Sequence, residues 1–353
     1  MLTSVRVIGA GLIGTSIALA LKNAGKKVEV VDSNSSNLAI ASDLVKSEQI
    51  STPDLILVAV PVEVTKQVVL KALLDNPGSV VCDLASVKSD LQVEVAKLSD
   101  GVKRFISLHP MAGRESSGAE SARADLFDGR AWIGIKNSTA DQQTQSLVSE
   151  LIDLCQGNLY WFTAKEHDEL VAAISHLPQV VSSALAAELL GLSEDQLNVA
   201  GQGIKDMTRL AKSNPLLWSQ IFLQNRLSLV PAIQSFINSL EQLKDDIEKN
   251  QLKNIVAFLE KGSSGKEKIP GKHGARSREY AYLPIVIDDK PGELSKIFNI
   301  CAEVNVNIED LTIEHSPGQE TGLITLAVSK NDIERLSTHL LSKGMKVHAA
   351  KNR

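Results

Sequence analysis

The first half of the chain alternates short apolar runs with stretches whose apolar residues recur at helical spacing. The runs that fit buried strands are Val5–Ile8, Lys27–Val31, Leu55–Val60, Ser79–Cys82, Phe105–Leu108, Ala131–Ile135 and Leu159–Phe162. An apolar helical stretch, Leu12–Ala24, follows the first of these runs. This repetition predicts an α/β domain over residues 1–163, with its strands largely parallel in one sheet.

Residues 164–261 show no strand pattern and predict an all-helical domain. Asn214 followed by Pro215 is typical of a helix start, with asparagine as the cap and proline in the first turn. Apolar residues recur at helical spacing at Leu216, Leu217, Ile221, Leu223, Leu227 and Val230. Such helices bury their apolar stripe against a partner. A second copy of the chain is the economical choice, so we expect a homodimer.

The last third begins with a linker over residues 262–279, where glycines and basic residues replace the apolar pattern. Residues 280–353 then predict a small domain of strands and helices in the order βαββαβ, which is that of a ferredoxin-like unit. The expected elements are strand Tyr280–Ile287, helix Glu293–Val304, strand Asn307–Glu314, strand Gly322–Ser329, helix Asp332–Lys343 and strand Met345–His348, with Ser316–Gly318 joining the two middle strands.

Composition narrows the class of protein. The chain has 353 residues, 43% hydrophobic and 22% charged, as in an ordinary globular protein of two or three domains. The net charge of -5 gives no reason to expect nucleic-acid binding. The N-terminus shows no targeting signal, and no apolar run approaches the roughly 20 residues of a membrane helix. We therefore expect a cytoplasmic protein without a membrane partner. The three dispersed cysteines favour neither disulfides nor a metal site.

The first strand leads into three glycines, Gly9, Gly11 and Gly14, in the spacing GxGxxG. Together with Leu12 and Ile13 they predict a turn and helix N-terminus that hold a pyrophosphate, the signature of a Rossmann dinucleotide-binding domain. Asp32 ends the second strand, 18 residues after Gly14. A carboxylate there accepts hydrogen bonds from the adenosine ribose and repels a 2′-phosphate, so the pattern favours NAD over NADP. Small polar neighbours, Ser33 and Asn34, leave the strictness of that preference open.

Two more segments are expected at the carboxyl edge of the sheet. Val60 and Pro61 end the third strand, where a loop passes over the adenosine side of the cofactor. Ser86 follows the fourth strand within DLASVKSDL, from which it can reach the nicotinamide end. The alternative for this segment is purely structural: Ser86 caps a helix and Lys88 is solvated.

The segment SLHPMAGRESSG, Ser107–Gly118, is the main candidate for chemistry. His109 stands before Pro110 at the end of an apolar run. Because proline disfavours the α region for the preceding residue, we expect the strand to stop there and turn. A histidine at the carboxyl end of a strand is well placed as an acid or base. The alternative is a structural histidine whose ring is satisfied by the backbone.

Two candidates come from the helical domain. Arg209, between apolar neighbours in KDMTRLAKSNPLLW, offers a guanidinium fork suited to a carboxylate ligand. The alternative is a surface ion pair, for instance with Asp206. His176 lies in SHLPQ, before Pro178, and is expected to line the same pocket.

Taken together, these motifs resemble the prephenate dehydrogenases of the tyrosine pathway, in the group that carries a C-terminal ACT domain. The resemblance covers nearly the whole chain. It rests on GAGLIGTS at Gly9–Ser16, DLASVKS at Asp83–Ser89, HPMAGRESSG at His109–Gly118, SHLP at Ser175–Pro178, KDMTRLAKSNPLLW at Lys205–Trp218, DKPGEL at Asp289–Leu294 and NVNI at Asn305–Ile308. We expect no chorismate mutase segment of the kind that is fused to some members.

The resemblance implies oxidative decarboxylation of prephenate to 4-hydroxyphenylpyruvate, with hydride transfer to NAD⁺. It implies that His109 accepts the proton of the substrate's C4 hydroxyl as a neutral base, and that Ser86 orients this hydroxyl and the nicotinamide. Arg209 is then expected to hold a substrate carboxylate, and His176 to line that pocket. No metal is implied.

The resemblance also implies a regulatory site in the ACT domain. Asp289, Gly292 and Leu294 in one loop, with Asn307 and Ile308 at a strand start, match the places where such domains hold an amino acid, commonly between two copies. Pathway logic points to L-tyrosine as the feedback effector. The alternative is a domain that only assists dimerisation.

Other functions remain open at this stage. Arogenate dehydrogenase performs the same chemistry on the amine analogue, and no feature of the sequence excludes it. A 3-hydroxyacid dehydrogenase shares a Rossmann domain followed by helices, but DLASVKS and HPMAG argue against it. A non-catalytic amino-acid sensor on a dehydrogenase fold is the alternative from another class, and the presence of both His109 and Arg209 weighs against it.

Overall fold

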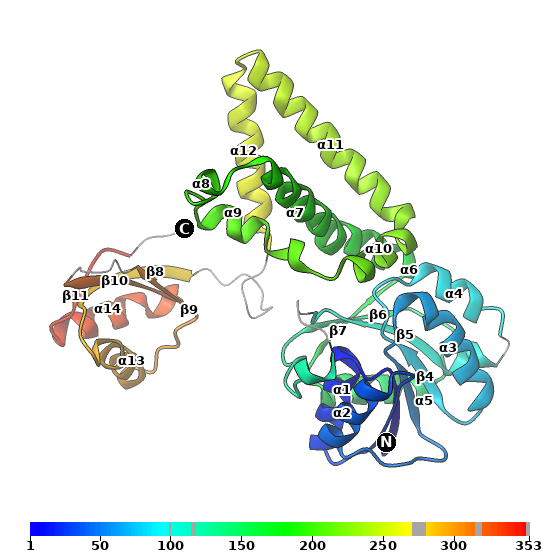
Figure 1. The fold of residues 1–353 in the computed structure, drawn as a ribbon. Helices are drawn as coiled ribbons and strands as arrows, with labels where there is room; N and C mark the ends of the chain where they lie inside the picture. The colour runs from blue at the N-terminus through cyan, green and yellow to red at the C-terminus, as the bar shows by residue number, and fades with distance from the viewer. Residues whose placement is uncertain (99, 114–117, 270–279, 315–319, 351–353) are drawn as a thin grey trace. The chain divides into compact units, whose positions relative to one another are not determined.

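A computed structural model describes residues 1–98, 100–113, 118–269, 280–314 and 320–350 (Figure 1). The chain forms two compact units, Met1–Lys266 and Glu267–Arg353. Each unit has its own hydrophobic core, and each is described by itself below.

The first unit is built on a seven-stranded sheet in the order β2-β1-β3-β4-β5-β6-β7. Its strands are β1 Ser4–Ile8, β2 Lys27–Val31, β3 Leu55–Val58, β4 Val80–Asp83, β5 Phe105–Pro110, β6 Ala131–Ile135 and β7 Asn158–Phe162. Strands β1 to β5 are parallel, whereas β6 runs antiparallel to β5 and pairs in parallel with β7. The expected α/β domain is therefore confirmed, with a reversed pair of strands at one edge.

Helices cover both faces of this sheet because successive residues of a strand point to opposite sides. In β3, Leu55 and Leu57 join the core under one layer of helices, while Ile56 and Val58 join the core under the other. The first layer contains α1 Leu12–Asn23, α2 Ser35–Val45 and α5 Gln142–Leu154; the second contains α3 Val62–Asp75 and α4 Ser89–Val95. Burial on both faces explains why these strands are continuous apolar runs.

The helical region begins with one long composite helix. It consists of α6 Ala164–Val171, a π-helical turn Ala172–His176, α7 Leu177–Glu188 and a 3-10 turn Leu189–Gly191. The segment Ala164–Gly191 is long and apolar enough to cross a membrane by length and composition, so the expectation that no segment meets this criterion was wrong. Core helices meet the same criterion, and this one carries buried Asp168, His167 and His176.

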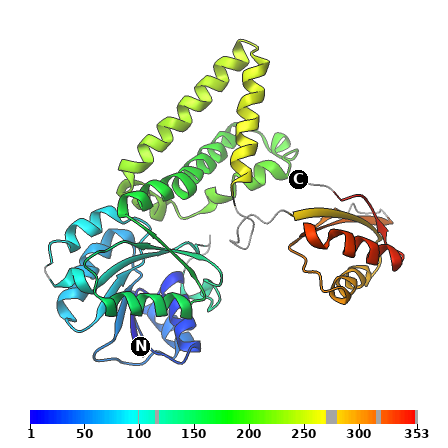
Figure 2. The same ribbon diagram turned by 180° about the vertical axis from the view of Figure 1, so that it is seen from behind.

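The remaining helices are α8 Glu194–Leu197, α9 Gln202–Met207, the 3-10 turn η5 Arg209–Lys212, α10 Pro215–Gln224, α11 Arg226–Glu248 and α12 Leu252–Glu267. Asn214 caps α10 through hydrogen bonds from the amides of Leu216 and Leu217, as predicted. The last two helices, α11 and α12, form a hairpin that extends away from the strands in both views (Figures 1 and 2).

Many apolar side chains of this helical region are exposed in the single chain. In α11 they include Leu227, Val230, Ile237, Leu240 and Ile247. Leu227 is 78% exposed. Exposed apolar side chains at helical spacing are the feature from which the sequence predicts that these helices pair with another molecule.

The predicted linker over residues 262–279 starts too early. Helix α12 continues through Gly262 and Gly265 to Glu267, because two glycines weaken a helix by only about 1 kcal/mol each relative to alanine. The rest of the predicted linker, residues 270–279, lies outside the described residues.

The second unit is a four-stranded antiparallel sheet in the order β11-β8-β10-β9, with the elements in the chain order βαββαβ. The elements are β8 Tyr280–Asp288, α13 Glu293–Glu303, β9 Asp310–Glu314, β10 Thr321–Ser329, α14 Ile333–Ser342 and β11 Lys346–Val347. The strand expected from Asn307 begins instead at Asp310, so Asn307 and Ile308 precede it. The predicted connection through Ser316–Gly318 lies outside the described residues.

Candidate active site

The carboxyl ends of the five parallel strands gather the predicted site residues at one edge of the sheet. The glycine turn follows β1, Asp32 follows β2, and Val60 and Pro61 follow β3. Ser86 follows β4, and His109 is the second-last residue of β5. This edge is where doubly wound sheets bind their ligands.

The glycine turn has the conformation that its sequence predicted. Gly9 has φ +111°, and a Cβ atom there would lie 2.3 Å from the carbonyl oxygen of Ala59. A Cβ on Gly14 would lie 2.0 Å from the carbonyl oxygen of Gly9. A Cβ on Gly11 would meet nothing within 4 Å. Gly11 is the N-cap residue of α1, and no side chain caps this helix N-terminus. The turn therefore leaves a space beside helix amide groups into which a pyrophosphate fits.

Asp32 is tied to this turn. Its Oδ2 accepts a hydrogen bond of 2.6 Å from the amide of Ala10, and its Oδ1 accepts one of 2.7 Å from the amide of Asn34. The side chain remains partly exposed. A carboxylate fixed in this way can accept hydrogen bonds from the hydroxyl groups of a ribose.

The segments after β3 and β4 differ from the sequence predictions in detail. Strand β3 ends at Val58, two residues early, so that Val60 and Pro61 lie in the loop, and Pro61 is the cap residue of α3. Ser86 is partly buried in the loop between β4 and α4. It does not cap α4, because that helix begins at Ser89 after Lys88. The structural alternative for Ser86 as a cap was therefore wrong.

His109 is hydrogen-bonded to a second histidine. The Nδ1 atom of His109 lies 2.8 Å from Nε2 of His167 in α6, and Nδ1 of His167 lies 2.8 Å from Oδ1 of Asp168. Strand β5 continues one residue beyond the expected end, since Pro110 still pairs with Trp132 of β6. His109 itself stays partly exposed, whereas His167 is fully buried.

The surroundings of His109 favour its neutral form. Burial lowers the pKa of His109 well below its ordinary value of 6.5, and the charges of His167, Lys88 and His176 lower it further. Burial also lowers the pKa of His167, against the raising effect of its hydrogen bond to Asp168. Burial alone raises the pKa of Asp168, but hydrogen bonds from His167 and Ser89 reverse this, and its net shift is downward. An ionised aspartate thus stands next to two neutral histidines.

Lys88, expected in one alternative to be solvated, is fully buried instead. Its ammonium group lies 2.6 Å from Oδ1 of Asp83 and 2.6 Å from the carbonyl oxygen of Leu108, the residue before His109. The hydroxyl of Ser107 donates to the other oxygen of Asp83. This network joins the ends of β4 and β5 and fixes the backbone that carries His109.

His176 ends the π-helical turn and is 1% exposed. The Nδ2 atom of Asn225 donates to the carbonyl oxygen of Asp168, which fixes the orientation of the amide, so the same NH₂ group donates to Nδ1 of His176 at 3.0 Å. The proton of a neutral His176 must then lie on Nε2. Burial lowers the pKa of His176 to about 4, so this neutral donor persists at ordinary pH.

Arg209 begins the 3-10 turn η5 and is exposed. Asp206, the partner named in the structural alternative, accepts a hydrogen bond from Gln202. Gln179, one helical turn after His176 in α7, donates a hydrogen bond of 2.9 Å to the carbonyl oxygen of Leu210. The segment that carries Arg209 is thereby attached to the helix that carries His176.

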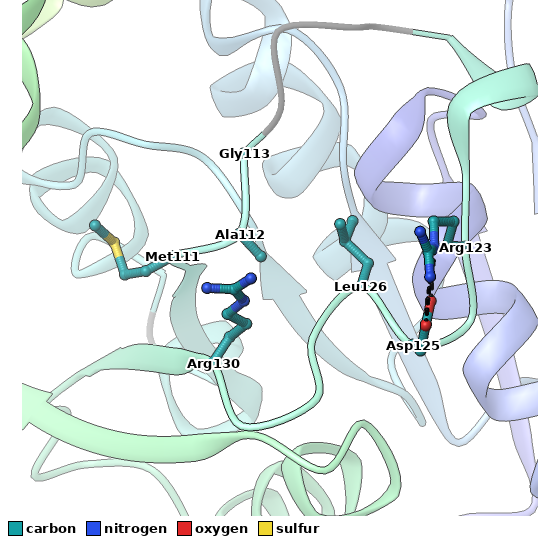
Figure 3. A pocket seen from close by; sticks show the side chains of 7 residues that line it. All are labelled: Met111, Ala112, Gly113, Arg123, Asp125, Leu126 and Arg130. Atoms are coloured by element: carbon teal, nitrogen blue, oxygen red, sulfur yellow. Dashed lines mark hydrogen bonds and ion pairs between the residues drawn. The ribbon is translucent and has the colours of Figure 1, made fainter. Parts of the chain in front are cut away.

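A pocket of about 370 Å³ lies directly beyond His109 in the chain (Figure 3). Met111, Ala112 and Gly113 line it together with Arg123, Asp125, Leu126 and Arg130. In Figure 3 the side chain of Arg130 lies beside Met111 and Ala112, whereas the pair Arg123 and Asp125 lies farther from them, beyond Leu126. Arg123 is paired with Asp125 at 2.6 Å, and the Arg130 side chain has no ion-pair partner among the residues that the structure describes. Residues 114–117 of the predicted histidine loop lie outside the described residues.

The residues predicted to bind an effector are split within the second unit. Asp289, Gly292 and Leu294 follow β8 at the end where Asp288 pairs with Thr321, whereas Asn307 and Ile308 precede Asp310, which pairs with Ala327. The two pairs are six residues apart along β10, about 20 Å at the usual rise of a strand. One copy of the unit does not bring the two segments to a single small ligand.

Sequence reasoning missed three residues of the site: His167, Asp168 and Asn225. Their signal in the sequence is weak. His167 and Asp168 are adjacent polar residues on the buried side of a helix that otherwise turns Val171 inward, and only the hydrogen bonds reveal what they contact.

Comparison with known proteins identifies the family of the chain. Residues 17–161 match the family model "Prephenate dehydrogenase, nucleotide-binding domain", and residues 163–261 match "Prephenate dehydrogenase, dimerization domain". A prephenate dehydrogenase of Lactococcus lactis is 29% identical over 334 residues, which are 89% of this chain and 91% of that protein.

Two solved structures are also similar. The prephenate dehydrogenase of Aquifex aeolicus, solved in complex with hydroxyphenyl propionate and NAD⁺, has a TM-score of 0.69 and 29% identity, over 76% of this chain and 99% of that one. An arogenate dehydrogenase of Synechocystis has a TM-score of 0.62 and 26% identity, over 75% and 99%. With both family models matched in sequence order and a Rossmann-like nucleotide-binding domain followed by the helical domain, the chain belongs to the prephenate dehydrogenase family.

Proposed function

We propose that the protein catalyses the NAD⁺-dependent oxidative decarboxylation of prephenate to 4-hydroxyphenylpyruvate, a step of L-tyrosine biosynthesis. The observation that carries this proposal is the position of His109. It is a neutral, partly exposed histidine at the sheet edge that also holds the glycine turn and Asp32. A base beside a dinucleotide site is the minimum that such a reaction requires.

The residues of the turn fit NAD⁺. The open space at Gly11 and the uncapped N-terminus of α1 suit its pyrophosphate, and Asp32 suits an unmodified adenosine ribose. When bound, NAD⁺ supplies the acceptor for the hydride that leaves carbon C4 of the substrate.

The protein's own task is to move one proton. The C4 hydroxyl passes its proton to Nε2 of His109 as C4 becomes a carbonyl carbon. Cleavage of the bond between the ring and its carboxylate releases CO₂ and returns the electron pair to the ring, which becomes aromatic. The oxygen on C4 then recovers the proton from His109. Ser86, in the loop next to β5, orients the hydroxyl.

The helical domain supplies the groups that recognise the substrate's carboxylates and keto group. Arg209 is exposed and offers a bidentate guanidinium group to a carboxylate. His176 is 1% exposed in the single chain, and its hydrogen bond from Asn225 leaves its proton on Nε2; we propose that this buried side chain supports the substrate pocket. The link from Gln179 to Leu210 holds these two residues in one part of the domain.

The test is an assay of NADH or NADPH absorbance with purified protein. Prephenate and arogenate are each offered with NAD⁺ and with NADP⁺. We expect turnover of prephenate with NAD⁺, and its loss by a factor of about 100 to 10,000 in His109→Asn, with NAD⁺ affinity retained. Turnover of arogenate alone would identify an arogenate dehydrogenase, as in the similar Synechocystis structure. Turnover of neither would favour a non-catalytic sensor.

The same proposal includes a homodimer formed through the helical domain. The exposed apolar side chains of α10, α11 and α12 and the match to a dimerization domain support it. A helical hairpin with this much exposed apolar surface is stable in water when another molecule covers it.

The proposal assigns the second unit as a regulatory ACT domain that binds L-tyrosine. Its support is the order βαββαβ, the sheet order β11-β8-β10-β9, and the positive φ of +94° at Gly292 in the predicted effector loop. Because the two effector segments lie at opposite ends of the sheet, the site needs loop Asp289–Leu294 of one copy and Asn307 of another. Calorimetry with the full-length protein and L-tyrosine tests this, and an absence of binding would leave the unit a role in assembly.

A further inference from the structure

A chain of hydrogen bonds leads from Asp168 to the candidate base. Asp168 and His167 are adjacent in α6, and His109 belongs to β5, so the chain crosses from the helical domain to the nucleotide-binding domain. Both bonds measure 2.8 Å. Asp168 is almost completely buried, with 3% of the residue exposed, and His167 is fully buried. These contacts are therefore a fixed part of the interior.

The aspartate is held as an acceptor. Its Oδ1 accepts from the amide of Lys88 at 3.0 Å, and its Oδ2 accepts from the amide of Ser89 at 2.9 Å and from the Ser89 hydroxyl. With three donors already directed at it, an ionised carboxylate is the form that fits, because a protonated one would have to donate. The bond to His167 must then run from Nδ1–H of the histidine to Oδ1.

The direction of this hydrogen bond determines which ring nitrogen of His167, and then of His109, carries the proton. A neutral His167 with its proton on Nδ1 has a lone pair on Nε2. The 2.8 Å contact can then form a hydrogen bond only if His109 donates from Nδ1. A neutral His109 with its proton on Nδ1 is left with an unprotonated Nε2.

We infer that Asp168 and His167 are positioning residues that hold His109 in the tautomer whose Nε2 accepts a proton. The inference rests on the proposed function for its catalytic consequence, although the tautomer itself is a property of the protein alone. The arrangement follows the logic of a catalytic triad, with a histidine inserted between the aspartate and the base.

The key variant is Asp168→Asn, which keeps size and removes the charge. An asparagine amide directed at Nδ1 of His167 reverses the chain: His167 would carry its proton on Nε2, donate to Nδ1 of His109, and leave His109 protonated on Nε2. A second variant, His167→Gln, keeps an oxygen able to accept from His109 Nδ1, whereas His167→Leu does not. The matched control is Glu166→Gln, two residues before Asp168 in the same helix, which also removes one negative charge.

Two measurements are made on full-length protein. Nitrogen-15 NMR of ring-labelled histidine, with the His109 signals assigned by their loss in His109→Asn, reports the tautomer without substrate or cofactor. Steady-state kinetics report kcat, KM and their pH dependence. For Asp168→Asn we expect the His109 proton to move to Nε2 and kcat to fall by a factor of about 100 to 10,000, no more than in His109→Asn, with KM and NAD⁺ affinity within a few-fold. His167→Gln should keep more activity than His167→Leu, and Glu166→Gln should match the wild type.

The outcomes separate the two proposals. A wild-type His109 with its proton on Nε2 would overturn the inference whether or not the enzyme is active. An active wild type whose kcat is unchanged in Asp168→Asn would also overturn it. An Nδ1 proton on His109 in a protein that turns over neither prephenate nor arogenate would support the hydrogen-bond chain and overturn the proposed function. If Asp168→Asn does not fold, the tautomer of the wild type and the comparison of His167→Gln with His167→Leu still test the inference.

Discussion

Lys88 and Asp83 form a fully buried ion pair, with Nζ of the lysine 2.6 Å from Oδ1 of the aspartate. The lysine also reaches the carbonyl oxygen of Leu108, and the hydroxyl of Ser107 satisfies the second aspartate oxygen. Because Leu108 precedes His109, the pair connects the stability of this end of β4 and β5 with the position of the base.

Removing the cation of this pair should destabilise the protein strongly. Lys88→Met leaves the buried Asp83 carboxylate without its counter-charge, and we expect the free energy of unfolding to fall by about 3–5 kcal/mol. Urea denaturation at neutral pH measures it. The control is Lys97→Met, which breaks an exposed, solvent-screened pair with Glu94 and should leave the free energy of unfolding almost unchanged. Equal losses in the two variants would contradict the prediction.

Stability should fall as the pH drops below 7. The pKa of His176 is near 6.5 in the unfolded chain and about 4 in the folded protein, so between these values only the unfolded chain takes up the proton. Folding stability is therefore complete above pH 6.5 and decreases towards pH 4, by about 3 kcal/mol from this group alone. The lowered pKa values of His109 and His167 act in the same direction.

Urea denaturation at pH 7.5 and pH 5 tests this dependence. His176→Gln keeps an acceptor for Asn225 and removes the titrating group, so the difference between the two pH values should shrink. A stability that is flat over this range in the wild type would refute the assignment.

The activity should persist at unusually low pH for a histidine base. Because the pKa of His109 lies well below 6.5, its neutral form survives under acidic conditions. We expect the acid limb of kcat/KM against pH to lie below 6.5, with activity lost only as His109 becomes protonated. An acid limb at or above 6.5, measured at a range of buffers and constant ionic strength, would be inconsistent with His109 as the base.

Two glycines of the turn should respond differently to substitution. Gly9→Ala places a Cβ 2.3 Å from the carbonyl oxygen of Ala59 at a φ of +111°, so we expect poor folding. Gly11→Val points into open space, so the thermal unfolding temperature should stay close to that of the wild type while NAD⁺ affinity falls at least tenfold. Differential scanning fluorimetry and NAD⁺ titration separate the two effects. Unchanged NAD⁺ affinity in Gly11→Val would remove the turn from the cofactor site.

The exposed side of α11 should be a dimer contact. The double variant Leu227→Arg with Val230→Arg places two charges on apolar positions that are 78% and 61% exposed in the single chain. We expect light scattering after size exclusion to show a dimer for the wild type and a monomer for this variant. Lys244→Glu, an exposed charge change in the same helix, should remain a dimer. A wild type that is monomeric at micromolar concentration would rule out this role.

The type and order of the elements could be predicted from the sequence alone. Apolar runs separated by helical stretches were enough for the α/β sheet, and the spacing of Gly9, Gly11 and Gly14 was enough for the turn, because both depend on local backbone geometry and on the side to which each residue points. The parallel order of the strands then placed Asp32, Ser86 and His109 at one edge. The cap at Asn214 was equally local.

The contacts of these residues could not be predicted, because they depend on the packing of distant segments. Three contacts join residues that are 5 to 58 positions apart in the sequence: Lys88 with Asp83, His109 with His167, and Asn225 with His176. The periodicity of apolar residues cannot predict such contacts. The same holds for the effector segments, whose separation depends on the pairing of β9 with β10. Local patterns specify elements, whereas the protonation of a base depends on which buried groups the packing brings within 3 Å of it.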